Sequence, residues 1–216
     1  MDEVHLEEQI ENLESEAEEE KGVWRIAPLD LGPDELAKYR LALGRVRKLG
    51  DPVLQQVAKP VETFNGSLAK KLRKMESIMV DSDGAGIAGP QLGFSRRAFL
   101  YRLWDENDQV GPTQIVINPE LLAHSQEKSW GPEGCLSIPS IGIRIERWDW
   151  IEFTYRTARG EHKSHRAEGF EARVIQHEWD HLDGVLISDL IGDEDRAEMI
   201  RLWNNPEETS HESSPS

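Results

Sequence analysis

The chain has 216 residues, a length that fits one large domain or one domain with tails. Its formal net charge is −16, and residues 1–21 hold ten acidic residues against one Lys, a local charge of −9, so the remainder carries only −7. This charge excludes a broadly basic nucleic-acid-binding surface. The absence of an 18-residue apolar run argues against a membrane span. A single Cys excludes an internal disulfide.

The first 22 residues form an acidic segment. Leu6, Ile10, Leu13 and Ala17 recur at roughly helical spacing, so a weak amphipathic helix is one interpretation, but repulsion among ten acids favours a disordered tail. The segment has neither the basic-then-apolar order of a secretory signal nor the Arg-rich composition of a transit peptide. Together with the single Cys, this predicts a cytoplasmic protein.

Four later segments have helical patterns. A helix is predicted from Pro33 to Leu43, with Pro and two acids in its first turn. An apolar stripe predicts a second helix over residues 67–82, after an irregular stretch to Val61. The third covers residues 170–182 and is apolar on two faces, which predicts that it is buried, with Phe170 on one of those faces. The fourth covers residues 193–203.

Short apolar runs predict strands between the second and third helices. They cover residues 98–101, 114–117, 141–145 and 150–155, and Arg159-Gly160 is a candidate turn into one more. The order of helix, strands and helix predicts an α+β fold.

The motif with the clearest chemistry is Gln176-His177-Glu178-Trp179-Asp180-His181. Its two His side chains, four residues apart, lie on one face of a helix. The only cysteine, Cys135, lies in a separate extended run, Glu133-Gly134-Cys135-Leu136-Ser137. A His/His/Cys set leaves a fourth metal position open for water, which is typical of a catalytic site and predicts metal-assisted hydrolysis.

Other interpretations of these residues stay open from the pattern alone. Cys135 could be a small buried hydrophobe or a nucleophile with a His partner. A peptidase of the H-E-x-x-H class would need a downstream acid, for which Glu194 and Glu198 are candidates, or a third His where Ile187 stands. A non-enzymatic peptide- or ribosome-binding protein with a vestigial site is the third alternative.

A glycine-rich run spans residues 84–93. Its spacing overlaps that of a nucleotide-binding loop, but a helix precedes it and Pro90 interrupts any helix after it. A backbone that approaches a ligand closely explains these glycines better.

In this order, the three runs resemble the signature motifs of peptide deformylases: the glycine-rich motif ending in Gln91, the motif at 133–137 and the motif at 176–181. Residues 50–54 also resemble the start usual in that family, and the likeness covers roughly residues 45–190. It implies short, largely antiparallel sheets packed around a buried helix that carries the H-E-x-x-H motif. The expected organisation is an acidic tail (1–22), an N-terminal helical extension (23–44), a catalytic domain (45–203) and a disordered C-terminal tail (204–216).

The resemblance also implies roles for individual residues. Cys135, His177 and His181 would hold one divalent metal ion, most often Fe²⁺, which Ni²⁺, Co²⁺ or Zn²⁺ can replace. Glu178 would transfer the proton, and Gln91 and the Leu136 N–H would stabilise the oxyanion. A peptide would pair with the backbone at four residues, which are Ala85, Gly86, Gly134 and Leu136.

The implied substrate is the N-formyl-methionyl end of a newly synthesised chain, and the product is formate. Ribosome association would follow from that substrate, whereas no sequence-specific nucleic acid and no membrane are expected as partners. Two positions depart from the family pattern: Gly89 stands where Ala is usual, and Gly142 where many members have Arg.

Overall fold

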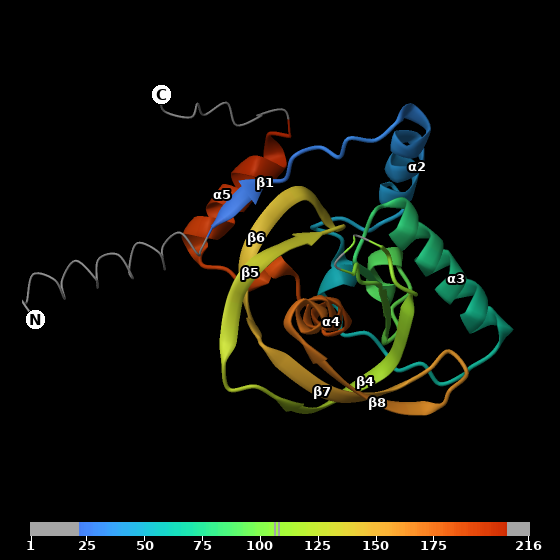
Figure 1. The fold of residues 1–216 in the computed structure, drawn as a ribbon. Coiled ribbons are helices and arrows are strands. Elements are labelled where there is room, and N and C mark those ends of the chain that lie inside the picture. The colour runs from blue at the N-terminus through green and yellow to red at the C-terminus, as the bar shows by residue number, and fades with distance from the viewer. Residues whose placement is uncertain (1–21, 106, 108, 207–216) are drawn as a thin grey trace, which may run out of the picture.

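The structure is a computed structural model that describes residues 22–105, 107 and 109–206, in which helices combine with antiparallel strands (Figure 1). Its strands are Val23–Arg25 (β1), Gly86–Ala88 (β2), Ala98–Tyr101 (β3), Gln114–His124 (β4), Lys128–Cys135 (β5), Ile138–Trp148 (β6), Trp150–Arg156 (β7) and His162–Glu168 (β8). Its α-helices are Pro33–Leu43 (α2), Gly66–Asp81 (α3), Gly169–Leu182 (α4) and Asp193–Asn204 (α5). Short 3₁₀ helices cover Pro52–Gln55 (η1), Gly89–Leu92 (η2) and Ile187–Asp189 (η3).

The four predicted helices are confirmed to within about a residue at each end. Helix α3 illustrates why: the side chain of Asn65 accepts hydrogen bonds from the N–H groups of Ser67 and Leu68, at 3.0 and 3.1 Å. The apolar stripe predicted for this helix is buried and consists of Leu68, Leu72, Met75, Ile78 and Met79.

The strands form two antiparallel sheets, with orders β1-β6-β5 and β2-β3-β4-β7-β8. The mixed helix and antiparallel-sheet fold was predicted correctly. The expectation of short strands is wrong for β4 and β6, which have 11 residues each. In both strands the backbone pairing continues past register shifts or polar residues, whereas the apolar sequence pattern stops there.

Helix α4 lies at the centre, seen end-on in Figure 1 with strands of both sheets around it. Ala172, Ile175 and Leu182 are fully buried in the core between the helix and the five-stranded sheet. Phe170 was expected on a buried face but is 57% exposed, because it lies in the first turn of α4, where the helix borders an open cleft.

The segment at 23–44 is only partly helical, contrary to expectation. It begins with β1, which pairs with β6, and the Arg25 guanidinium donates to the carbonyl oxygens of Leu202 and Asn205 at the end of α5. Helix α2 then packs on α3. The tails predicted at 1–22 and 204–216 lie almost wholly outside the described residues, although Asn204 itself belongs to α5. Among the residues described, no helix is both long and apolar enough to cross a membrane.

Candidate metal centre

The two motifs meet where the end of β5 faces α4. Cys135, His177 and His181 each offer a ligand atom, and these atoms all lie within 4.8 Å of one another. The Cys135 Sγ is 3.4 Å from the His181 Nε2, and all three residues are buried. A metal about 2.0–2.3 Å from each donor could be held by atoms at this spacing. The structure therefore brings the three predicted ligands together.

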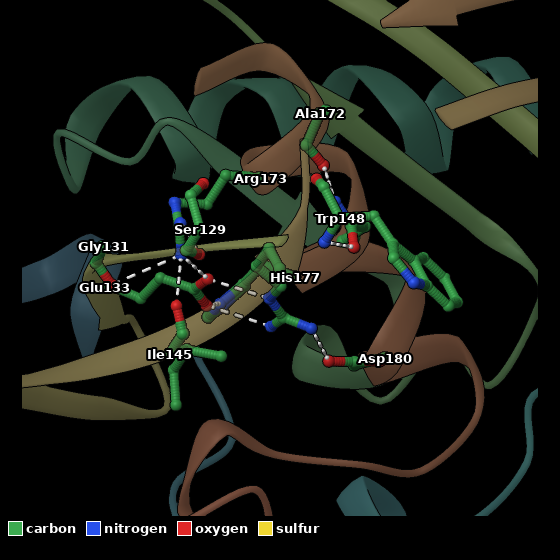
Figure 2. A network of polar contacts seen from close by, with 11 residues as sticks. Ser129, Gly131, Glu133, Ile145, Trp148, Ala172, Arg173, His177 and Asp180 are labelled. Atoms are coloured by element: carbon green, nitrogen blue, oxygen red, sulfur yellow. Dashed lines mark hydrogen bonds and ion pairs between the residues drawn. The ribbon is translucent and has the colours of Figure 1, made fainter. Parts of the chain in front are cut away.

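A buried ionic network holds the His177 ring in place (Figure 2). The Glu133 carboxylate lies 2.9 Å from the His177 Nδ1 and accepts two hydrogen bonds from the Arg147 guanidinium, at 2.9 and 3.0 Å. Arg173 donates to the same carboxylate at 3.1 Å, and Arg147 donates also to Asp180. With its Nδ1 bound to Glu133, His177 has only its Nε2 left for a metal.

The same network also connects the candidate metal centre to strands β5 and β6. Arg173 donates to the carbonyl oxygens of Gly131, Ile145 and Ser129 on β5 and β6. The amide of Gln176 bonds both the N–H and the carbonyl oxygen of Trp148. These contacts fix α4 against the β5–β6 hairpin, so that the ligands from the two elements keep a constant spacing.

Two ionisable groups at the site have shifted pKa values. Burial opposes ionisation of the Cys135 thiol, but His181 and His177 beside it hold its pKa well below the usual value, which favours a thiolate. Burial raises the pKa of Glu178 to about 7, against the opposing effect of the two histidines. The Glu178 Oε2 is buried and has no partner among the described residues. Glu178 can therefore both accept and release a proton near neutral pH.

Gln91 is oriented towards the same place. Its Oε1 accepts the N–H of Ala88 at 2.8 Å, which turns its Nε2 towards the Cys135 Sγ at 3.7 Å and the Ser137 Oγ at 3.2 Å. A cleft of about 480 Å³ opens above the site. All of the remaining predicted site residues line it: Ala85, Gly86, Gly134 and Leu136, together with Gln91, Cys135, His177 and Glu178.

The alternative ligand sets are not assembled. Within the described part of the chain, the group that could hold a metal is Cys135, His177 and His181. Glu194 is exposed on α5, and Glu198 pairs with Arg201 on the same helix at 2.8 Å. The peptidase interpretation, which needs one of these acids at the metal, is wrong.

The structure accounts for both departures from the family pattern. A β-carbon at Gly142 would overlap the indole of Trp24, its register partner on β1. A β-carbon at Gly89 would overlap the carbonyl oxygen of Phe94 and lie 2.9 Å from that of Arg96. Side chains are therefore excluded from these positions by this chain's own neighbouring residues.

Sequence reasoning did not assign a role to Glu133, Arg147 or Arg173. Glu133 could have been found, because it lies two residues before Cys135 in an extended segment and so points to the same face. The two arginines come from β6 and α4, and nothing in their spacing indicates that they share one carboxylate.

Comparison with known proteins gives one consistent family. A family model described as polypeptide deformylase matches residues 44–197. The chain is 46% identical over 147 residues to a peptide deformylase of Thermotoga maritima, covering 68% of this chain and 86% of that protein. The crystal structure of Thermotoga maritima peptide deformylase superposes with a TM-score of 0.63 and 44% identity, over 68% of this chain and 97% of that one. A peptide deformylase from Acinetobacter baumannii, solved with Met-Ala-Ser bound, gives a TM-score of 0.64 and 33% identity, over 68% and 96%.

Proposed function

The chain belongs to the peptide deformylase family, whose members are metallohydrolases that remove the N-formyl group from newly synthesised polypeptides. From this premise we propose which of its residues carry out the reaction. Cys135, His177 and His181 hold one divalent cation, Glu178 transfers protons, and Gln91 with Leu136 stabilises the developing charge. The observation that supports these roles most directly is the buried set of three donors beside Glu178, whose buried Oε2 has no partner among the described residues.

The donor set fits the proposed cation. One thiolate and two imidazoles suit Fe²⁺, Zn²⁺, Ni²⁺ or Co²⁺, whereas Mg²⁺ and Ca²⁺ prefer oxygen donors. We propose Fe²⁺ as the resident ion, following the family resemblance, with Ni²⁺, Co²⁺ or Zn²⁺ as substitutes. Such a cation, held by Cys135, His177 and His181, would lower the pKa of a water molecule at the site and so supply a hydroxide nucleophile near neutral pH.

Glu178 performs the proton transfers. With its pKa raised to about 7, the carboxylate takes a proton from the attacking water and gives it to the departing amine. Glu178 is only 3% exposed, where α4 contacts β2, so bulk water has little access to this proton. The products are formate and a free amino terminus.

The formyl oxygen becomes negatively charged as the hydroxide adds to the formyl carbon. The Gln91 amide, held by the Ala88 N–H, already directs its Nε2 into the site, so little reorganisation accompanies the reaction. The N–H of Leu136, next to the ligand Cys135, is the second proposed donor.

The peptide adds as a strand between two sheet edges. β2 is the outer strand of one sheet and β5 the outer strand of the other, and both border the cleft. Backbone groups at Ala85, Gly86, Gly134 and Leu136 would pair with an extended peptide, and the cleft beside them would take its side chains. The peptide bound in the Acinetobacter baumannii relative supports a short linear substrate.

The substrate defines the partners and the compartment that we propose. Formyl-methionyl ends exist on chains during or just after synthesis, so the protein would act in the cytoplasm and close to the ribosome, with the nascent chain as its partner.

Formate release from formyl-Met-Ala-Ser tests the proposal. The assay uses Fe²⁺-loaded protein without oxygen, and the matched control is Glu178→Gln, which keeps the volume of the side chain and removes its basicity. We expect turnover with the natural chain, a loss of about 10²–10⁴ in kcat for the variant, and equal metal content in the two. Metal-loaded natural protein that releases no formate would support the non-enzymatic alternative.

A further inference from the structure

A segment outside the family-matched region forms part of the cleft. Residues 26–40, here called the N-terminal strap, precede the match at 44–197. Ile26, Leu29, Leu36 and Tyr39 of the strap line the same cleft as Cys135, His177 and Glu178. The cavity that holds the candidate metal centre is thus bounded on one side by residues that the family model does not cover.

The strap connects the two sides of the cleft. At its first end, β1 pairs with β6, where the indole of Trp24 covers Gly142, and the Arg25 guanidinium holds the end of α5. At its other end, α2 packs on α3, which leads into β2. Figure 1 shows the segment running from β1, beside α5, across to α2. The two ends of the strap are therefore anchored on opposite sides of the cleft, one beside β6 and β5 and the other beside α3 and β2.

The strap lies close to the reacting end of the cleft. The Ile26 Cδ1 is 3.2 Å from the position that a β-carbon would take on Gly134, the residue before Cys135. A peptide in an extended conformation advances about 3.3 Å per residue. A substrate whose formyl group lies at Cys135 therefore places the first few residues of its chain beside the strap.

The strap residues that line the cleft are mainly apolar, and Arg40 is the charged residue among them. Ile26 is 38% exposed and Leu29 is 42% exposed, and Phe170 on α4 exposes 57% across the same cleft. Apolar side chains that face a cleft while still reachable by water gain free energy when a ligand covers them.

We propose that the N-terminal strap is a specificity-determining wall that favours formyl-peptides with apolar side chains at the second and third residues. This inference rests on the proposed function, because it takes the formyl-peptide as the occupant of the cleft. Ile26 and Leu29 would contact those side chains, while the methionine and the formyl group lie deeper, towards α4.

Two peptides that differ only after the methionine test the proposal. The ratio of kcat/KM for formyl-Met-Leu-Leu to that for formyl-Met-Ser-Ser is measured for the natural chain, for Ile26→Ser and for Leu29→Ser. We expect each variant to lower this ratio about three- to ten-fold, with the loss in KM rather than in kcat. The matched control is Leu41→Ser on α2, where the side chain is 63% exposed and outside the cleft lining, and it should keep the natural ratio.

Calorimetric titration with deformylated Met-Leu-Leu gives a readout that does not depend on turnover. Weaker binding to Ile26→Ser and Leu29→Ser than to Leu41→Ser supports the wall. An unchanged ratio, an equal loss on both peptides, or the same effect from Leu41→Ser overturns it. If the natural chain releases formate from neither peptide, the proposed function fails, and the titration still decides whether the strap binds apolar side chains.

Discussion

The Glu178 carboxylate lies against the α-carbon of Gly86, in space that a β-carbon at position 86 would need. An ideal β-carbon there would overlap the Glu178 Oε1 and lie 2.7 Å from its Cγ and Cδ. Gly86 begins β2 and Glu178 lies on α4, and these two elements are in direct contact. The glycine at position 86 therefore gives the proposed general base its room, independently of any backbone conformation that only glycine adopts.

Gly86→Ala should consequently displace Glu178 and leave the metal ligands in place. A displacement of about 1 Å can cost on the order of 10² in rate, so we expect kcat to fall by about that factor at unchanged metal content. Formate release and metal analysis measure the two quantities. Gly66→Ala is the control, because Gly66 lies in the first turn of α3 with no atom within 4 Å of an added β-carbon. Full turnover by Gly86→Ala would show that the position of Glu178 is not critical.

Cys135→Ser should weaken metal binding and activity together. A serine hydroxyl has nearly the same size but stays protonated, so the site loses its one anionic donor while both imidazoles remain. Competition with a chelator measures affinity, and formate release measures turnover. A variant that retains natural affinity would contradict the assignment of Cys135 as a ligand.

Glu133→Gln should reduce both metal affinity and folding stability. Burial alone would raise the pKa of Glu133, but His177 and Arg147 hold it at about 2, so the group is ionised at neutral pH. A neutral amide leaves Arg147 and Arg173 without their shared buried counter-ion, which costs about 3–5 kcal/mol in typical buried pairs. Loss of the oriented His177 should lower metal affinity by about 10–100-fold.

Urea unfolding and chelator competition test this pair of effects. Glu198→Gln is the matched control, since its pair with Arg201 lies on the surface and should contribute almost nothing. Because the pKa of Glu133 is lowered, its contribution to stability is present above the unfolded value of 4.5 and is lost as the pH falls towards 2. Equal unfolding midpoints for the two variants would show that the network is not stabilising.

Tyr101→Phe should make the free energy of unfolding less dependent on pH in the alkaline range. Burial, and then the hydrogen bond to Glu171 at 2.8 Å, raise the pKa of the Tyr101 hydroxyl above its ordinary value of 10.0. Below pH 10 the hydroxyl is protonated in both the folded and the unfolded chain. Above pH 10 the hydroxyl ionises first in the unfolded chain, so the free energy of unfolding falls as the pH rises. Urea unfolding between pH 9 and 11 should show a shallower decline for the variant. Superimposable declines would contradict this account of Tyr101.

The elements that local pattern determines were predictable from the sequence. The helices α3 and α4 have apolar residues at helical spacing, and the two histidines lie on one helical face whatever surrounds them. The three candidate metal ligands could be predicted for the same reason, because each of the two motifs is contiguous in the sequence. Only the contact between the two motifs depends on the tertiary structure.

The elements that were missed depend on pairing across long separations. β5 contains two glycines and a proline, so it lacks the apolar alternation of a strand and was expected only as an extended segment. A strand after the Arg159-Gly160 turn was expected, but the bounds of β8 were not, because that strand is almost wholly polar. β1 has three residues and exists because β6, more than a hundred residues later, offers it an edge. The burial of Glu133 beside two arginines likewise requires β5, β6 and α4 together.

The single thiol of the chain gives the site an internal reporter. Cys135 is the only cysteine among 216 residues, so a thiol-specific reagent reports on this one atom without background from other thiols. Its lowered pKa favours the reactive thiolate, and its place in the cleft lining gives the reagent a route of entry. The rate of alkylation therefore measures how open the cleft is, and a titrated count of protected thiols measures how many molecules in a preparation carry an occupied centre.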